Sequence, residues 1–435
     1  MAGLAAGFAA RSLELPFRIF EKTGQAGGNC VTFSQDGFRF DSGAHRLHDR
    51  DAEATGQLEL LLGKSLQLIS VPSQVYHREM LLAFPFKMGD LATKLGWPFL
   101  LRAAGEVFFS RLRRKDAAAD FAAAEERNYG KTLARLFLLN YSEKLWGLPG
   151  EQLAVEISGN RLAGLNLLTF LKGIFLPESS AARHLEGPFY YPDDGIGKVS
   201  ESLAGGCGSM NIRTNAEISR VFHDGRRIQA VEINNNETFA CAAAVNSIPL
   251  DRFLRLLDPP PPPEVLDAAA SLRFRQLALA ALFLNRETIT RAATIYFPDP
   301  SFPFTRVYEP KNRSALMAPP GQTSLVAEIP YAAGDQYEHM EDERLIEMVR
   351  SQLVRIGLIA ECEVIAAGVR RLADAYPVLE KGVEKKRHEI FLYLSGFENL
   401  KTIGRCGTFR YLHIHHLLPE AARAVAELRL REKTL

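Results

Sequence analysis

The stretch MAGLAAGFAARSLELPFRIFEK, residues 1–22, decides the fold expected for this chain. It opens with small residues from Ala2 to Arg11, which favour a helix that presses closely against a sheet. The letters FRIFEK then predict a short strand that ends at the acid Glu21. A helix that is followed by a strand ending in an acid is typical of a dinucleotide-binding unit.

The fingerprint of such a unit is G-x-G-x-x-G/A with an acid roughly 20 residues later. Met1 stands at its first position, Gly3 at the second and Ala6 at the third, and Glu21 follows Gly3 by eighteen residues. Gly3 would let the backbone approach a pyrophosphate at the helix N-terminus, and Glu21 would accept hydrogen bonds from ribose hydroxyls. An ordinary surface helix before a strand is the alternative interpretation.

The first strand of such a unit is central and buried on both faces, and nothing before Met1 could form it. We therefore expect a Rossmann-like domain that lacks its first strand, in an α/β fold. Because the loss would leave buried backbone groups unpaired at about 1–3 kcal/mol each, we expect the natural start to lie upstream.

Two further segments continue the pattern. Gly27 and Gly28 follow Glu21 by six and seven residues, and GFRFDSGAHRLH spans residues 37–48. Together with the opening stretch they resemble the FAD-binding proteins of the amine oxidase and protoporphyrinogen oxidase type. That resemblance implies that FAD is the cofactor.

Other segments resemble the UDP-galactopyranose mutase-like branch of these flavoproteins. They are GAHRLH (43–48), LNYSEKLWGLP (139–149), ISGNRLAG (157–164), PFTRVYEP (303–310), AYPV (375–378) and GRCGTFRYLHIHH (404–416). In the last of these, His413 stands where the family has Asp. FYYPDDGIGKVSESLA (189–204) looks more like the oxidase-type relatives.

The resemblance implies a set of site residues. Those expected at the cofactor are Gly3, Ala6, Glu21, Gly27, Gly28, His45, Ile218, Gly404, Arg405, Gly407 and Ile414. Those expected to act in catalysis are His45, His48, Arg161, Arg306 and Tyr411. Those expected at the substrate are Trp146, Arg161, Arg306, Glu309, Tyr376 and Tyr411, with Glu309 orienting Arg306 and the two arginines binding phosphate.

Each of these residues also has a simpler interpretation. His45 and His48 are spaced i, i+3, but no third metal ligand lies near them in the sequence, so we expect no metal. Trp146 would otherwise be a core anchor and Ile218 plain core, while Arg161 and Arg306 would otherwise be surface arginines.

The 435 residues exceed the size of a single core, and we expect two interleaved domains. Residues 1–50, 188–260 and 371–435 would form a discontinuous FAD-binding domain. Residues 51–187, mostly helical by periodicity, and 261–370 would form a mixed helical and sheet substrate domain. The five prolines Pro259–Pro263 predict a stiff linker that is neither helix nor central strand.

Composition narrows the class of protein. Lys and Arg number 52 against 51 Asp and Glu, which gives no argument for nucleic acid as a partner. Five scattered cysteines without a CxxC pair favour reduced thiols in a cytoplasm. The apolar stretch Leu95–Phe109, followed by RLRRK, favours a domain-packing helix, with an interfacial amphipathic helix on a membrane surface as the alternative.

Three functions follow from this pattern. The first is an FAD-dependent oxidoreductase that transfers hydride to flavin N5 from a small molecule. The second is a mutase in which reduced FAD acts on a UDP-sugar without net redox change. The third is a non-catalytic remnant. Fold-level kinship does not choose among them.

Overall fold

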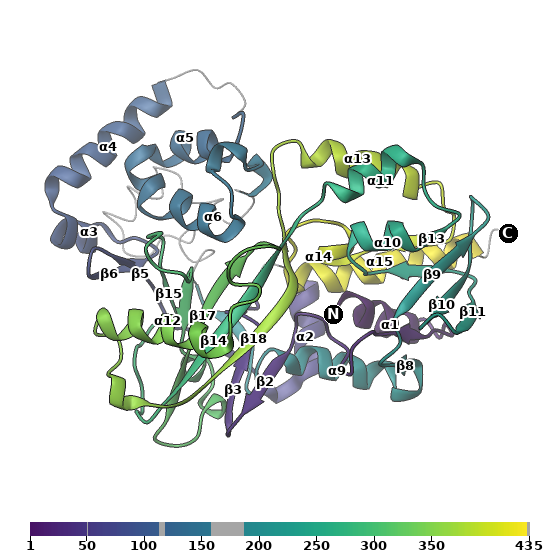
Figure 1. Ribbon diagram of the computed structural model, residues 1–435, viewed down its shortest axis with the longest axis horizontal. Helices are drawn as coiled ribbons and strands as arrows, with labels where there is room; N and C mark the ends of the chain where they lie inside the picture. Colours follow the sequence, from purple (N-terminus) through teal and green to yellow (C-terminus); the bar gives the residue numbers. More distant parts are fainter. Residues whose placement is uncertain (50, 113–117, 158–186, 433–435) are drawn as a thin grey trace.

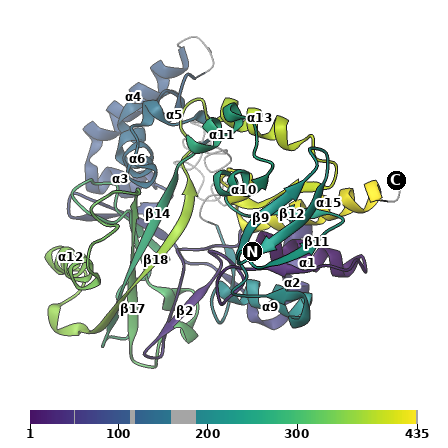
Figure 2. The ribbon, with the colours of Figure 1, turned by 45° about the vertical axis from the view of Figure 1, so that its right-hand side comes forward.

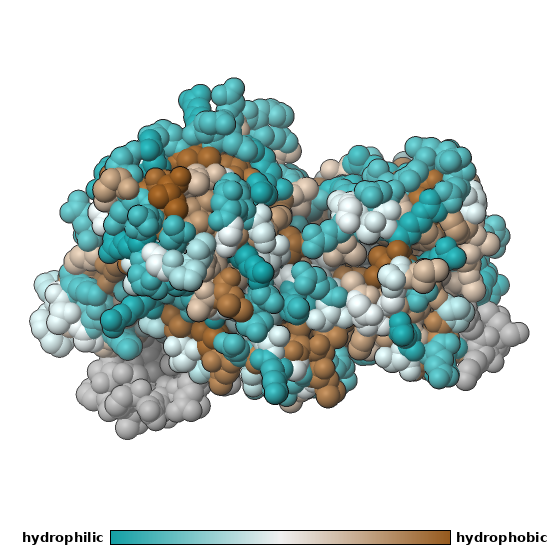
Figure 3. Space-filling view, turned by 90° about the horizontal axis from the view of Figure 1, so that it is seen from below, coloured by the Kyte–Doolittle hydropathy of each residue, from teal (hydrophilic) through white to brown (hydrophobic). Residues whose placement is uncertain are grey.

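The computed structural model describes residues 1–49, 51–112, 118–157 and 187–432. Two lobes lie side by side (Figures 1 and 2). One holds the helices α3–α6 over a large sheet, and the other gathers α1, α2, α9 and α15. Seen from below, hydrophilic residues surround smaller hydrophobic patches, and the surface is indented between the lobes (Figure 3).

The large sheet has seven strands in the order β18-β14-β17-β16-β15-β5-β6. β14 (Phe274–Leu284) and β17 (Thr323–Tyr331) are antiparallel, and all nine residues of β17 are buried. The apolar runs LALAALFL (277–284) and SLVAEIPY (324–331) suit strands covered on both faces. The remaining strands are β18 (Val364–Pro377), β16 (Arg306–Tyr308), β15 (Thr294–Tyr296), β5 (Ser73–His77) and β6 (Met80–Phe84).

The other lobe contains the expected helix–strand unit. α1 (Ala2–Ser12) is followed by β1 (Ile19–Phe20), which pairs in parallel with β8 (Ile212–Arg213). A methyl group added at Gly7 would lie 2.5 Å from Ile19 Cδ1, so small residues let α1 pack this closely on the strand. A second parallel pair joins β12 (Ala244–Asn246) to β19 (Leu400–Thr402). The flanking helices are α2 (Ala52–Leu62), α9 (Gly197–Cys207), α14 (Gly404–Gly407) and α15 (Ile414–Glu432).

A strand-rich meander follows α9. β9 (Ile218–His223), β10 (Ile228–Ile233) and β11 (Glu237–Ala240) are antiparallel neighbours, and β13 (Leu257–Asp258) pairs with β9. The tight turns use residues that tolerate positive φ: Asn234 and Asn235 here, and Asp36 and Gly37 between β2 (Thr32–Gln35) and β3 (Phe38–Asp41).

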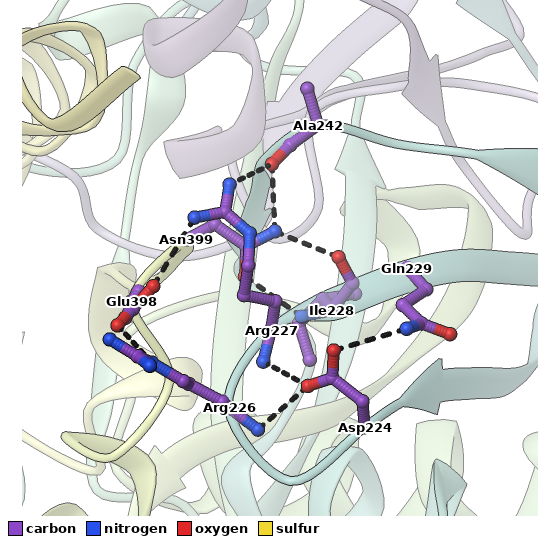
Figure 4. A network of polar contacts seen from close by, with 8 residues as sticks. All are labelled: Asp224, Arg226, Arg227, Ile228, Gln229, Ala242, Glu398 and Asn399. Carbon is purple, nitrogen blue, oxygen red and sulfur yellow. Dashed lines mark hydrogen bonds and ion pairs between the residues drawn. The ribbon is translucent and has the colours of Figure 1, made fainter. Parts of the chain in front are cut away.

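A polar network ties this meander to the C-terminal part of the chain (Figure 4). The buried side chain of Asn399 donates to Ile228 O and Ala242 O, both at 2.7 Å, and accepts from Ile228 N at 2.8 Å. Glu398 pairs with Arg226 and Arg227 beside it. Asn399 directly precedes β19, so the network sets the start of the strand that leads to α14.

Residues 51–187 are less helical at their start than expected. β4 (Leu66–Ile69) pairs with β7 (Phe189–Pro192), while β5 and β6 form a hairpin at the edge of the large sheet. The hairpin turn places Arg78 and Glu79 at positive φ, and neither residue is a turn signal that sequence reasoning recognises. The helices that follow are α3 (Met88–Leu95), α4 (Trp97–Leu112), α5 (Phe121–Leu133) and α6 (Leu139–Trp146).

The proline run is also only partly as expected. Pro259–Pro262 connect β13 to α11 (Pro263–Ala270), but Pro263 begins that helix. The first helical position has no intrahelical acceptor for its N–H, so proline is tolerated there. The other helices are α10 (Leu250–Leu256), α12 (Asp342–Arg355) and α13 (Val383–Leu394).

Candidate active site

A cavity of about 410 Å³ lies where segments distant in sequence converge. Its lining includes Met1 and Ala2 at the start of α1, the Gly27–Cys30 turn, the segment 42–46, and residues at the α14–α15 junction. Predicted site residues on the lining are Glu21, Gly27, Gly28, His45, His48, Arg306, Tyr376, Gly404, Arg405, Tyr411 and Ile414.

The start of α1, the Gly27–Gly28 turn and Gly404 meet closely at one part of this cavity. The Met1 amino group donates to Gly27 O at 2.9 Å, and a methyl group added at Gly404 would lie 2.7 Å from Ala2 Cβ. Gly27 and Gly28 both have positive φ, at 139° and 58°. The backbone is therefore bare where a phosphate group would have to approach it.

Glu21 belongs to this part of the cavity. Its Oε1 accepts from Thr23 N at 2.9 Å and from Thr23 Oγ1 at 2.8 Å, and no described residue donates to Oε2. One carboxylate oxygen thus orients the side chain while the other can receive a ligand hydroxyl.

Four predicted cofactor residues do not line the cavity. Gly3 and Ala6 lie within α1, where a methyl group added at Gly3 would be 3.3 Å from Ser247 Oγ, so they serve helix packing. Ile218 pairs in β9 with Ile233. Gly407 ends α14 against Asn246 and Ser247. Contact of these four residues with the cofactor stays a prediction, and Gly3, Ala6 and Gly407 belong to α1 and α14, which do line the cavity.

His45 is held as a neutral imidazole. Its Nε2 lies 3.0 Å from Ser42 Oγ, which itself donates to Asn29 O. Burial, followed by the charges of Arg405 and Arg306, lowers the pKa of His45 from 6.5 to about 3. A neutral ring with Nε2 donating to Ser42 leaves Nδ1 as an acceptor. His48 also lines the cavity and meets Phe189 edge-on.

The segment that carries His45 is anchored by a residue that sequence reasoning missed. Asp41 is buried and accepts from Thr32 Oγ1, Tyr191 OH and Ile196 N at 2.6, 2.5 and 3.0 Å. Burial raises the pKa of Asp41, which these hydrogen bonds oppose. The carboxylate thereby fixes the start of the Ser42–Arg46 segment.

Arg306 is paired with Glu328, a second residue that was missed. Glu328 Oε2 lies 2.7 Å from Arg306 Nε, and Glu328 Oε1 accepts from Ala44 N at 2.7 Å. Burial would lower the pKa of Arg306, but Glu328 holds it well above its ordinary value. The signal was available, because Glu328 is the one acid in the apolar strand SLVAEIPY.

Glu309 is not the partner of Arg306, so that prediction is wrong. Its buried carboxylate accepts from Thr290 N at 2.8 Å and Thr323 Oγ1 at 2.7 Å, and also from Ile289 N and Asn312 Nδ2. Side chains alternate along a strand, and Arg306 begins β16, three residues before Glu309, so the two point to opposite faces.

Aromatic side chains form the wall next to Arg306. Arg306 Nη2 donates to Tyr376 OH at 3.3 Å, and the rings of Tyr376 and Tyr411 stack with centroids 6.1 Å apart. The Arg405 guanidinium lies 4.9 Å from the Tyr411 ring and donates to Leu412 O and Ala375 O. Arg405 therefore holds both the wall and the backbone around it.

Trp146 stands behind this wall and not in it. It is 2% exposed and does not line the cavity, and its ring meets Tyr376 and Tyr411 edge-on at 6.0 and 5.7 Å. The core-anchor interpretation is correct here. Other lining rings are Phe84, Phe121, Phe137, Tyr141 and Tyr296, which the sequence did not single out.

Lys144 connects the helices to the strands below them. Its Nζ donates to Phe297 O, Asp299 O and Phe304 O at 2.6, 2.9 and 2.8 Å. These carbonyls flank β15 and precede β16, which carries Arg306. The helix that presents Tyr141 is thus joined to the hairpin that presents Arg306.

Arg161 lies outside the described residues. Within the described part of the chain, no cluster of three or more His, Cys, Asp or Glu could hold a metal ion. No described helix is both long enough and apolar enough to cross a bilayer.

The cavity fits FAD on these observations. Bare glycine backbone and the N-terminal end of α1 suit a pyrophosphate, and the available oxygen of Glu21 suits a ribose. The other part of the cavity is lined by aromatic rings and holds the neutral imidazole of His45. It suits a flat ring system beside His45 and Ala44.

Solved structures share the fold over nearly the whole chain. A reduced UDP-galactopyranose mutase matches with a TM-score of 0.85 and 18% identity, covering 98% of this chain and 93% of that one. A putative protoporphyrinogen oxidase from Exiguobacterium sp. 255-15 matches at 0.76 and 17%, covering 99% and 96%. Cyclohexylamine oxidase from Brevibacterium oxydans matches at 0.70 and 11%, covering 100% and 97%.

These identities support the fold alone. A search of curated proteins finds no significant sequence relative. The model of the family described as flavin containing amine oxidoreductase, however, matches residues 1–378 of the 435. The chain therefore belongs to the flavin-containing amine oxidoreductase family, and its cofactor is FAD.

Proposed function

We propose that this FAD-dependent oxidoreductase oxidises a small, largely apolar molecule at a C–N or C–H bond. The observation that carries the proposal is the Arg306–Glu328 ion pair at the substrate end of the cavity. Because the pair is close to neutral overall and aromatic rings surround it, this end of the cavity suits a largely apolar molecule.

The residues have distinct roles in this proposal. When bound, FAD supplies a hydride acceptor at N5. His45 keeps a neutral acceptor at Nδ1, and Arg306 with the Tyr376 hydroxyl orients a polar group of the substrate. Tyr411 and His48 would complete the catalytic set, and the aromatic wall would exclude water from the reacting bond.

The cavity would lie between two domains divided as the sequence suggests, with residues 1–50, 188–260 and 371–435 on the cofactor side. Gly27 and Gly28 come from the first of these segments and Gly404 comes from the last. Their meeting at one cavity supports that division. A cytoplasmic location is supported by the five cysteines, all of which are free.

A nucleotide sugar is the second candidate substrate. Arg306, Tyr376 and Tyr411 face the same cavity, and a phosphate could use such donors. The pairing of Arg306 with Glu328 leaves Arg306 little unmatched charge for a diphosphate, so Arg405, which donates to backbone carbonyls, would have to supply that charge.

The test begins with the absorbance spectrum of purified protein. We expect stoichiometric flavin, and anaerobic bleaching by one or more members of a panel of small amines and alicyclic compounds. Protein without flavin would support the remnant hypothesis instead. Interconversion of UDP-galactose ring forms by dithionite-reduced protein, lost in Arg306→Ala, would overturn the oxidoreductase proposal.

A further inference from the structure

The helix α4 (Trp97–Leu112) presents apolar side chains on two sides. Leu100, Ala103 and Val107 are buried against the core. The outward side carries Trp97, Leu101, Phe108 and Phe109, which we call the α4 stripe. Their side chains are 69%, 71%, 59% and 64% exposed.

The stripe is a continuous feature. At 100° per residue, Trp97, Leu101 and Phe108 lie within about 40° of one another, and Phe109 borders them. The Phe108 and Phe109 rings contact each other with centroids 5.6 Å apart. A helix with apolar side chains on both sides ordinarily buries both sides. The exposed outward side of α4 is therefore a candidate contact surface for a partner.

Charges around the stripe point to an anionic partner. Residues 87–112 carry four basic residues and two acidic ones. Lys94 pairs with Asp90 at 2.6 Å and Arg102 with Glu106 at 3.0 Å, so both acids are matched. The segment therefore has two basic residues in excess, one of which is the exposed Lys87 directly before α3.

We propose that the α4 stripe binds the headgroup region of an anionic lipid bilayer, with α4 lying parallel to the membrane plane. Trp, Leu and Phe on one side of a helix and cations beside them are the features of interfacial helices. The helix lies in the outer layer of its lobe, away from the sheet, so a flat surface can approach it (Figure 1). This inference does not depend on the substrate of the enzyme.

The test uses the purified holoenzyme and vesicles of 70% phosphatidylcholine and 30% phosphatidylserine. We expect flotation with these vesicles, weaker binding to pure phosphatidylcholine, and weakening by salt. The double variant Phe108→Ser/Phe109→Ser should bind at least about tenfold more weakly, because it removes two apolar side chains from the interface.

Leu392→Ser is the matched control, because Leu392 is equally exposed at 67% but lies on α13. It should bind vesicles as the unaltered enzyme does. Both variants should keep their flavin absorbance and melting temperature, which separates lost binding from lost folding.

Trp97 gives a second, local readout. The chain has two tryptophans, and the other, Trp146, is 2% exposed. Bromine-labelled lipids should therefore quench the fluorescence of Trp97 selectively.

Absence of vesicle binding would overturn the proposal, as would equal binding by the double variant. A concentration-dependent dimer that the double variant abolishes, without vesicle binding, would show that the stripe joins two copies of this chain instead.

Discussion

Glu328 is positioned between two parts of the cavity wall, with Oε2 2.7 Å from Arg306 Nε and Oε1 2.7 Å from the backbone nitrogen of Ala44. Glu328 is fully buried, and the Arg306 side chain is only 16% exposed. One carboxylate thus orients both the arginine and the segment that we expect to lie beside the flavin.

Glu328→Gln should destabilise the folded protein by about 3–5 kcal/mol, because it leaves a buried arginine without its opposite charge. Urea denaturation of the holoenzyme measures this loss. Glu347→Gln, which breaks an exposed pair with Arg350, is the control and should change stability by less than about 1 kcal/mol. Equal effects of the two substitutions would contradict the role given to Glu328.

His45 predicts a pH dependence of stability. Its folded-state pKa of about 3 lies below its ordinary 6.5, so the unfolded chain binds more protons between these values. The contribution of His45 is therefore complete above about pH 6.5 and is lost as the pH falls towards 3. Melting temperatures across this range should decline less steeply in His45→Asn. The same change at exposed His339 should leave the slope unaltered.

Gly27→Ala should lower FAD affinity by more than about tenfold, because the added methyl would lie 2.8 Å from Ser200 Oγ at a φ of 139°. Ser200 cannot yield easily, since its hydroxyl donates to Cys30 O at 2.5 Å. Fluorescence titration of apoprotein with FAD measures the change.

Gly225→Ala is the control for Gly27→Ala, because it introduces backbone strain without a steric clash. Gly225 also has a positive φ, at 91°, but nothing lies within 4 Å of an added methyl group. It should lose about 1–2 kcal/mol of stability and retain its FAD affinity. Loss of FAD binding here as well would show that strain alone explains the Gly27 result.

Asn399→Ala should cost about 1–3 kcal/mol of folding stability, because Ile228 N, Ile228 O and Ala242 O lose a buried partner (Figure 4). Gln229→Ala removes only an exposed contact with Asp224 and should be within about 0.5 kcal/mol of the unaltered protein. Chemical denaturation of the two variants measures both changes. Equal stability of the two variants would show that the Asn399 hydrogen bonds do not stabilise the fold.

Much of the fold could be predicted from local signals. Small residues in α1, the acid after β1 and the glycine pair before β2 each have a local physical cause, and they led to the right cofactor. The β5–β6 hairpin was missed because Arg78 and Glu79 form its turn at positive φ, where glycine or asparagine is usually found.

The site was predicted less completely, for a different reason. The resemblance implied His45 and Arg306 as site residues, and both line the cavity, but Glu328, which holds Arg306 and the backbone of Ala44, was not implied by it. Only the pairing of β16 with β17 brings Arg306 opposite Glu328. Glu309 is close to Arg306 in sequence, but its carboxylate binds Thr323 and other groups instead. Trp146 is buried behind the aromatic side chains that line the cavity.

The three hydrogen bonds from Lys144 to backbone carbonyl oxygens limit how a molecule can enter the cavity. A hinge that swung α6 away from the strands would break all three bonds together, at about 1 kcal/mol apiece. We therefore expect a molecule to enter through parts of the rim that Lys144 does not join, while α6 stays attached to the strands that carry Arg306.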